Sequence, residues 1–213
     1  MSQSLAKTAV KGTIWSAVGK FGVMAIQFMI YVVLARLLTP ADFGAIGMLM
    51  IFIIVCQTFV DSGFSSALVQ KKDTTQLDYS TVFFWSLAIG IVIFSILFFS
   101  APYIANFYNM PVLSPVLRVF GVNVIFAGTV GTQVARLQKT MQFRAIACVD
   151  ISTYILAAAI SIYMAKAGFG VWALVALNLC QTIGKSALLY IITRWLPSLS
   201  FSWTCLLYTS DAA

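Results

Sequence analysis

Six long apolar stretches follow one another along this chain, and short polar connections separate them. A helix needs roughly 20 mostly apolar residues to cross a bilayer, and each stretch reaches that length. Because the connections are short, neighbouring helices should run antiparallel. The pattern therefore predicts an all-α, polytopic integral membrane protein with six transmembrane helices, at residues 14–38, 41–69, 80–101, 112–135, 143–165 and 170–195.

The composition agrees with a lipid environment and narrows the chemistry. Of the 213 residues, 61% are apolar and 9% are charged, whereas a soluble domain carries about 25% charged residues. The chain has no histidine and no glutamate, and its four cysteines form no Cys-x-x-Cys pair. The usual zinc and acid–base constellations therefore have too few parts, and we expect neither an enzyme nor a metal or cofactor site.

The basic residues give a predicted orientation. The net charge of +7 does not indicate nucleic acid as a partner, because the basic residues lie mostly between the apolar stretches. One set of connections carries eight of them and the other set carries only Arg36 and Lys166. By the positive-inside rule, the richer side is cytoplasmic and both chain ends lie there. The eight residues are Lys7, Lys11, Lys71, Lys72, Arg136, Lys139, Arg144 and Arg194.

The first outer turn carries a helix-start signal. Thr39 is expected to cap the second helix, Pro40 to occupy its first position, and Asp42 to lie near its positive dipole end. This structural role is sufficient to explain the turn.

Five charged residues fall inside the predicted spans: Lys20, Asp61, Arg118, Asp150 and Lys185. An ionisable group at the bilayer centre costs about 2.5–3.5 kcal/mol, so each should be paired, hydrated or snorkelling. With a helical rise of about 1.5 Å per residue, all except Arg118 reach a level roughly 9–14 Å from the cytoplasmic boundary. Arg118 lies at a similar depth from the outer boundary.

Polar residues accompany these charges at helical spacing. Gln27 lies on the face of Lys20, while Asn178 and Gln181 lie on the face of Lys185. Such faces should turn away from lipid, either lining a hydrated cavity or forming a dry polar seam. The substrate or cavity candidates are Lys20, Gln27, Arg118, Asn178, Gln181 and Lys185, and the coupling or ion-pair candidates are Asp61 and Asp150.

Two interpretations of the charges remain open. In the functional one, Lys20, Arg118 and Lys185 attract an anionic head group, while Asp61 or Asp150 takes up a coupling cation or proton. In the structural one, Lys20 snorkels to the interface, and Asp150 and Lys185 simply pair.

The last ten residues, 204–213, have an unusual sequence. They resemble translated sequencing-adapter read-through at the end of a fragmentary gene, and the alternative is a short interfacial tail. We expect residues 1–203 to form one six-helix lobe and residues 204–213 to be a non-native tail.

Several short motifs occur in a recognisable order. They are Ala-Val-Lys-Gly-Thr-Ile-Trp-Ser at 9–16, Leu-Ala-Arg-Leu-Leu-Thr-Pro-Ala-Asp-Phe-Gly at 34–44, Asp-Ser-Gly-Phe-Ser-Ser-Ala-Leu-Val-Gln-Lys-Lys-Asp at 61–73, Ser-Thr-Val-Phe-Phe-Trp at 80–85, Met-Gln-Phe-Arg-Ala at 141–145 and Gly-Phe-Gly-Val-Trp-Ala-Leu-Val at 168–175. Together they resemble the polysaccharide transporter family of Wzx-type oligosaccharide flippases, in the colanic-acid and exopolysaccharide branch. That family belongs to the multidrug/oligosaccharidyl-lipid/polysaccharide exporter superfamily.

The resemblance implies a two-lobed transporter with a central cationic cavity and alternating access in the bacterial inner membrane. The implied substrate is an undecaprenyl-diphosphate-linked oligosaccharide, and other polysaccharide-assembly proteins are possible partners. The sequence departs from the family in lacking a second helical lobe. Such transporters place substrate between two repeats, so we expect this chain to be a fragment that is inactive alone.

Three other functions are weighed against this one. Another exporter of the same superfamily, of the multidrug or teichuronic-acid type, would keep the fold, but cationic drugs should require more intramembrane acids than Asp61 and Asp150. A membrane enzyme of glycan assembly would need a larger outer loop or a His/Asp/Arg cluster. A non-transporting scaffold would tolerate neutralisation of Lys20, Asp150 and Lys185 together.

Overall fold

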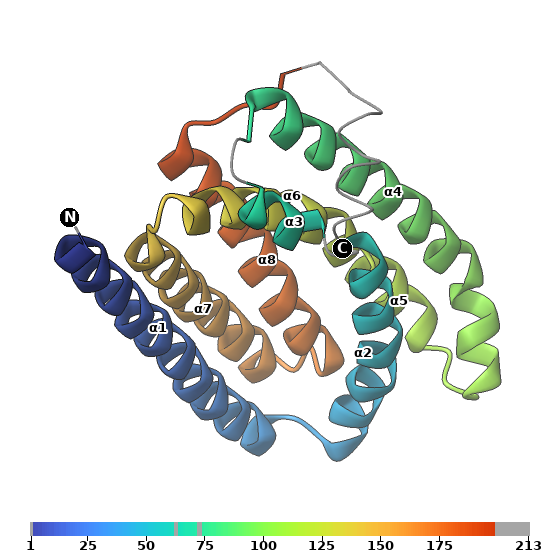
Figure 1. Cartoon of the computed structure of the whole chain (residues 1–213). Coiled ribbons are helices and arrows are strands. Elements are labelled where there is room, and N and C mark those ends of the chain that lie inside the picture. Colours follow the sequence, from blue (N-terminus) through green and yellow to red (C-terminus); the bar gives the residue numbers. More distant parts are fainter. Residues whose placement is uncertain (1, 62–63, 72–73, 199–213) are drawn as a thin grey trace.

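The computed structural model describes residues 2–61, 64–71 and 74–198, and in these residues it contains helices and no strand. Figure 1 shows the helices arranged as a bundle. They are α1 (Ser2–Leu37), α2 (Pro40–Asp61), α3 (Phe64–Gln70), α4 (Gln76–Phe107), α5 (Leu113–Phe120), α6 (Val122–Lys139), α7 (Phe143–Lys166) and α8 (Val171–Thr193).

Six segments in the described part of the chain are long and apolar enough to cross a membrane, so the predicted fold class is confirmed. Two predicted spans are each made of two helices. The second comprises α2 and α3, on either side of residues 62–63, and the fourth comprises α5 and α6, which meet at Gly121. The third span is longer than predicted, because α4 begins at Gln76 and ends at Phe107.

The junction between α5 and α6 depends on a close approach to α4. A Cβ atom on Gly121 would lie 3.2 Å from the Phe94 ring, which leaves little room for any other residue. The Val124 N–H donates to the Gly121 carbonyl oxygen at 2.9 Å, a tighter i+3 turn than a regular α-helix makes. The fourth span therefore changes from α5 to α6 at a packing contact.

Helix pairs approach closely where glycine meets a small residue. α1 packs against α7, α7 against α8, and α6 against both α4 and α8. A Cβ atom on Gly19 would lie 2.8 Å from the Cβ of Ala147, and one on Gly128 would lie 2.8 Å from the Cβ of Ser86. Without a side chain at Gly19 and Gly128, the backbones of α1 and α7, and of α6 and α4, can touch.

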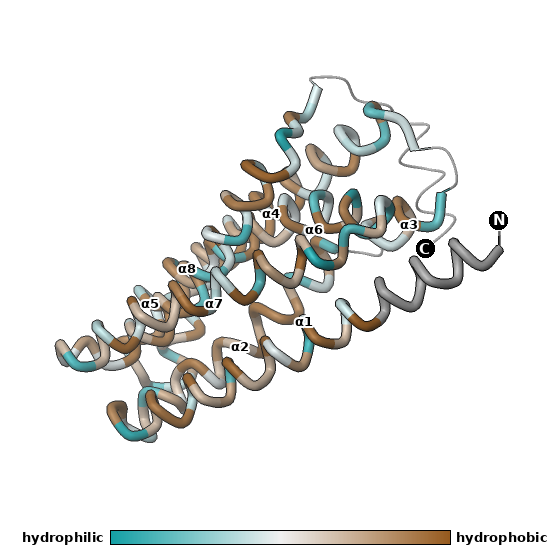
Figure 2. The backbone as a smooth tube through the Cα atoms, turned by 90° about the vertical axis from the view of Figure 1, so that its left-hand side faces the viewer, coloured by the Kyte–Doolittle hydropathy of each residue, from teal (hydrophilic) through white to brown (hydrophobic). Residues whose placement is uncertain are grey.

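The bundle surface is suited to lipid. Large apolar side chains are exposed along α1 and α4, including Phe21, Phe28 and Phe99. Figure 2 shows hydrophobic residues over most of the length of the helices. A soluble monomer rarely exposes apolar patches on this scale, whereas a bilayer would cover them.

The predicted cap of α2 is confirmed. The Thr39 N–H donates to a carboxylate oxygen of Asp42 at 3.0 Å, and the Asp42 N–H donates to the Thr39 hydroxyl at 3.3 Å. α2 begins at Pro40, as predicted. Asp42 also contacts the α7–α8 turn, because a Cβ on Gly170 would lie 3.0 Å from Asp42 Oδ1. The α1–α2 and α7–α8 turns therefore lie together at one end of the bundle.

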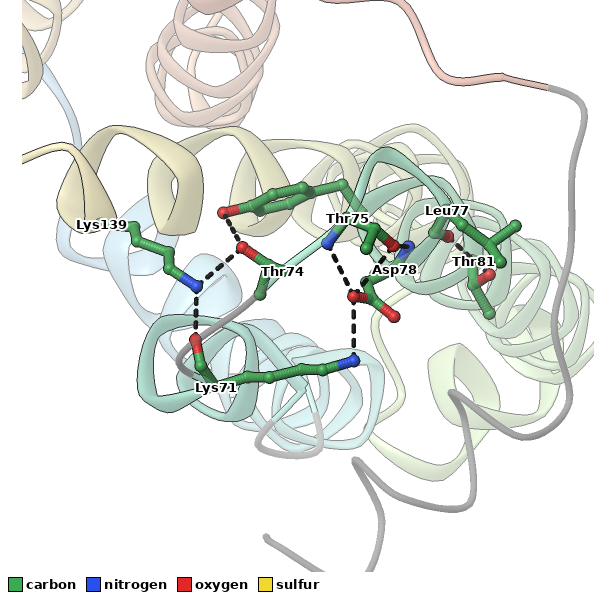
Figure 3. Close-up of polar contacts among 8 residues, drawn as sticks. Lys71, Thr74, Thr75, Leu77, Asp78, Thr81 and Lys139 are labelled. Atoms are coloured by element: carbon green, nitrogen blue, oxygen red, sulfur yellow. Dashed lines mark hydrogen bonds and ion pairs between the residues drawn. The ribbon is translucent and has the colours of Figure 1, made fainter.

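The opposite end is held by a polar cluster, which we call the basic-end network: Lys71, Thr74, Thr75, Asp78 and Lys139. The Lys71 ammonium lies 2.9 Å from Asp78 Oδ2, and Asp78 forms a capping box with Thr75 at the start of α4. Lys139, at the end of α6, donates to the Lys71 carbonyl oxygen and, at 2.7 Å, to the Thr74 hydroxyl (Figure 3). The network therefore joins the ends of α3 and α6 to the start of α4.

Candidate functional site

A cavity of about 1180 Å³ lies between α2, α3, α6 and α8. Phe120 of α5 also lines it. Within the described part of the chain, none of the lining residues comes from α1, α4 or α7. The described lining residues thus belong to the second, fourth and sixth spans.

The cavity wall is rich in uncharged hydrogen-bonding groups. Its polar lining residues are the carboxamides Gln57, Gln70, Asn123, Gln138, Asn178 and Gln181, the hydroxyls Thr58, Ser65, Ser66 and Thr182, and the charged residues Asp61 and Lys185. A carboxamide both donates and accepts hydrogen bonds, as a hydroxyl does. The wall therefore suits a ligand with many hydroxyl groups or bound water.

Asp61 is the acid of this wall. It is the last residue of α2, its side chain is exposed, and its Oδ1 accepts a hydrogen bond from the Ser65 hydroxyl at 2.7 Å. Gly131 of α6 faces this pair, because a Cβ there would lie 2.8 Å from Ser65 Oγ and 3.7 Å from Asp61 Oδ1. The glycine leaves space that a side chain would fill, so the carboxylate remains open to the cavity.

Lys185 is the cation of the wall, and its charge is compensated. Its ammonium lies 2.6 Å from Asp150 Oδ1, across the contact between α8 and α7. The two side chains are 19% and 21% exposed, so both are largely withdrawn from solvent. An ion pair of this kind removes most of the attraction that Lys185 would exert on an anionic ligand.

The deepest polar group of the wall is Asn123, near the start of α6. Its side chain is buried, with 2% exposure, and its Oδ1 has no hydrogen-bond partner among the described residues. On α8, the Asn178 amide nitrogen donates to the Leu174 carbonyl oxygen at 2.9 Å, and the Thr182 hydroxyl donates to Gln181 Oε1 at 3.3 Å.

Four sequence candidates line this cavity: Asp61, Asn178, Gln181 and Lys185. Asp150 is connected to it through Lys185. This places residues from the second, fifth and sixth spans within one polar region.

The other three candidates lie elsewhere. Lys20 is exposed on α1, Gln27 is half-buried on the same helix, and neither lines the cavity. The Arg118 guanidinium lies 4.7 Å from the centre of the Phe98 ring, so it faces α4 instead of the cavity. The cavity wall is therefore less cationic than the resemblance implies.

Sequence reasoning named Asp61 of α2 but missed Gln57 of the same helix and Asn123 of α6. Gln57 and Asp61 are four residues apart and share one helical face, a signal that was present in the sequence. Asn123 stands alone among apolar neighbours, so the sequence indicates a position turned away from lipid but does not tell a cavity position from a core position.

These features define a class of protein, namely a multi-pass membrane protein with a polar cavity within its bundle of spanning helices. A family model described as "Polysaccharide biosynthesis protein" matches residues 33–210. The chain belongs to this family, as its sequence motifs indicate.

The curated relatives agree with this assignment. The chain is 29% identical to the succinoglycan biosynthesis transport protein ExoT of Rhizobium meliloti, over 92% of this chain and 40% of that protein. It is 28% identical to the teichuronic acid biosynthesis protein TuaB of Bacillus subtilis, over 93% of this chain and 41% of that protein. It is 24% identical to the lipopolysaccharide biosynthesis protein WzxC of Escherichia coli, over 70% of this chain and 30% of that protein.

The chain thus spans about 40% of the length of the first two of these relatives. No solved structure matches it significantly. The predicted tail at residues 204–213 lies outside the described residues.

Proposed function

We propose that this chain is the amino-terminal six-helix lobe of a flippase. The whole transporter would move undecaprenyl-diphosphate-linked oligosaccharide across the bacterial inner membrane for surface-polysaccharide synthesis. The observation that carries the proposal is the cavity, which places a carboxylate and six carboxamides inside a bundle of spanning helices. Polar groups at such positions are unfavourable unless they bind a ligand, water or one another.

In this proposal the cavity is one wall of the substrate path. Transporters built from two repeats bind substrate between them and alternate access by moving one repeat against the other. The second wall would come from a lobe outside this chain, so residues 1–203 alone would be inactive. The family match and the share of each relative that the chain covers support this division.

Asp61 is the better candidate for a coupling cation or proton. It is exposed at the cavity and its carboxylate accepts one hydroxyl hydrogen bond, whereas Asp150 is held in the ion pair with Lys185. Lys20 and Arg118 would meet an anionic head group only outside this cavity.

The charge distribution supports an orientation with both ends in the cytoplasm. The basic-end network holds Lys71 and Lys139 together, and Arg136 lies over the Trp195 ring at 5.7 Å. The opposite end carries Arg36 and Lys166. The positive-inside rule assigns the first of these ends to the cytoplasm.

A teichuronic-acid exporter is the second candidate, because the teichuronic acid biosynthesis protein TuaB aligns with 93% of this chain. Both candidates carry an anionic or lipid-linked glycan, so they share the fold and the direction of transport. A multidrug exporter is less suitable, because Asp61 is the single acid among the described lining residues.

The test is complementation of a bacterial strain that lacks its own oligosaccharide flippase. The 213-residue chain and the longer reading frame recovered from the source DNA are expressed separately, and surface polysaccharide is measured. We expect the longer protein to restore the polysaccharide, the short chain not to restore it, and Asp61→Asn in the longer protein to abolish the restoration.

The protein level in the membrane is measured alongside, so that loss of activity is separated from loss of the protein. Restoration by the short chain alone would contradict the need for a second lobe. A longer protein that inserts normally into the membrane, but does not restore the polysaccharide in a flippase-deficient strain, would contradict the flippase function.

A further inference from the structure

The chemistry of the cavity wall indicates which part of a lipid-linked glycan it would meet. Phosphate groups are held in proteins by arginine or lysine, or by clustered backbone N–H groups. The described wall has one cation, Lys185, and Asp150 already neutralises it at 2.6 Å. Asp61 adds a negative charge that has no ion-pair partner among the described residues, and this charge repels a diphosphate.

The uncharged polar groups of the wall favour sugar hydroxyls over phosphate. Gln57 of α2, Asn123 of α6, and Asn178 and Gln181 of α8 reach the cavity from three different helices. Each carboxamide can donate to one sugar hydroxyl and accept from another. A carboxylate such as Asp61 can also accept hydrogen bonds from sugar hydroxyls, so it need not interfere.

Asn123 is a second, independent observation that points to a ligand at this wall. Its side chain is more than nine-tenths buried and lines the cavity, and its Oδ1 has no partner among the described residues. A buried oxygen without a partner is destabilising, and native proteins keep few such groups. A donor that enters the cavity, such as a sugar hydroxyl, would satisfy this oxygen.

We propose that this wall is a glycan subsite, in which Gln57, Asn123, Asn178 and Gln181 hydrogen-bond to hydroxyl groups of the oligosaccharide. The diphosphate lies outside it, against groups that this wall does not supply. The inference rests on the proposed function, because it assumes that a lipid-linked glycan enters the cavity.

The test measures binding to the purified 213-residue chain in lipid nanodiscs by saturation-transfer NMR. The probes are the oligosaccharide released by mild acid from the lipid-linked pool of the source strain, and inorganic diphosphate as a competitor. We expect saturation to pass from the wild-type protein to the glycan protons, and we expect diphosphate not to reduce this signal. Gln57→Leu/Gln181→Leu should bind the glycan about 30-fold more weakly, since two hydrogen bonds are lost.

Two further variants separate a glycan subsite from an anion site and from a structural effect. Gln57→Glu/Gln181→Glu keeps the shape and the accepting oxygens, and the oxygen that replaces each amide nitrogen can accept from a sugar hydroxyl, so glycan affinity should fall less than in the leucine variant. An anion site would instead lose more affinity than in the leucine variant, because two negative charges are added. Gln142→Leu is the matched control, since this amide is exposed at the start of α7, outside the cavity.

The proposal is overturned if the wild type does not saturate the glycan, if diphosphate displaces it, or if the control loses as much affinity as the double variant. These results are independent of complementation. A longer protein that restores polysaccharide while the short chain fails to bind free glycan would remove the subsite and leave the flippase function in place.

Discussion

The basic-end network and the cavity wall are both polar regions in an apolar bundle, but their hydrogen bonding differs. In the network, one carboxylate oxygen of Asp78 accepts from the Lys71 ammonium, the Thr75 N–H and the Thr75 hydroxyl, at 2.9, 2.8 and 3.1 Å (Figure 3). In the cavity, Asp61 accepts from one hydroxyl, and Asn123 Oδ1 accepts from no described residue.

The difference separates two uses of polar residues. A group whose hydrogen-bonding capacity is filled by neighbouring residues contributes to stability and has little left for a ligand. A group that is buried without a partner reduces stability unless a ligand completes it, whereas an exposed group is hydrated and remains available to a ligand. The basic-end network is therefore expected to hold the helices together, whereas the cavity wall is expected to bind a ligand.

Removing the carboxylate of the network should have the largest effect. Asp78→Ala removes the partner of Lys71 and one half of the capping box of a 32-residue helix, at a residue that is 4% exposed. We expect a loss of about 3 kcal/mol in the free energy of unfolding, from the cap and the broken ion pair together. Urea unfolding in detergent micelles, followed by tryptophan fluorescence, measures it.

The matched variant for this prediction is Asp61→Ala, which removes an exposed carboxylate from the cavity wall. It should change the free energy of unfolding by less than about 0.5 kcal/mol. Equal losses in Asp61→Ala and Asp78→Ala would contradict the separation between the two regions.

The Asp150–Lys185 ion pair combines properties of both regions, because Lys185 lines the cavity and its charge is paired with Asp150. Lys185→Met leaves the Asp150 carboxylate unpaired, and we expect a loss of about 2 kcal/mol in the free energy of unfolding. Asp150→Asn/Lys185→Met should recover most of that loss, because neither charge is then left alone.

A double-mutant cycle measures the coupling between these two residues, and we expect about 1 kcal/mol or more. Additive effects of the two single substitutions would show that the 2.6 Å contact contributes nothing to stability. In that case Lys185 would be free to attract an anion, and the diphosphate could lie in this cavity after all.

The sequence predicted the six spanning segments because only a bilayer explains apolar runs of this length. It did not predict the change of helix at Gly121, because that junction depends on the Phe94 ring of a different helix. It also placed the start of α4 too late. Polar residues from Gln76 to Ser80 precede the apolar stretch, but the capping box at Thr75 and Asp78 includes them in the helix.

The site could be predicted only in part, because helical spacing shows which residues share a face but not which faces meet. Asn178, Gln181 and Lys185 share one face of α8 by their spacing, and the structure has all three lining the cavity. The stripe with Lys20 and Gln27 has the same appearance, yet α1 packs on α7 and does not reach the cavity. Only the tertiary arrangement distinguishes these two cases.

Asn123 gives the smallest expected effect on stability, with the opposite sign. Asn123→Leu replaces a buried amide, whose Oδ1 has no described partner, with an apolar side chain of similar size. We expect the free energy of unfolding to stay unchanged or to rise by up to about 1 kcal/mol, since a buried unsatisfied oxygen is removed. Glycan binding, measured by saturation transfer, should fall in the same variant.

Gln133→Leu is the control for Asn123→Leu. Gln133 is a fully buried amide of the same helix whose Oε1 accepts from the Thr193 hydroxyl at 2.9 Å. Its loss removes this hydrogen bond, while the Thr193 hydroxyl keeps the Leu189 carbonyl oxygen as an acceptor at 2.8 Å, so the free energy of unfolding should fall by about 0.5–1 kcal/mol. If Asn123→Leu destabilises the protein as much as Gln133→Leu does, then Asn123 is a structural residue. The cavity wall would then be maintained for packing, and the contrast with the basic-end network would not mark a binding site.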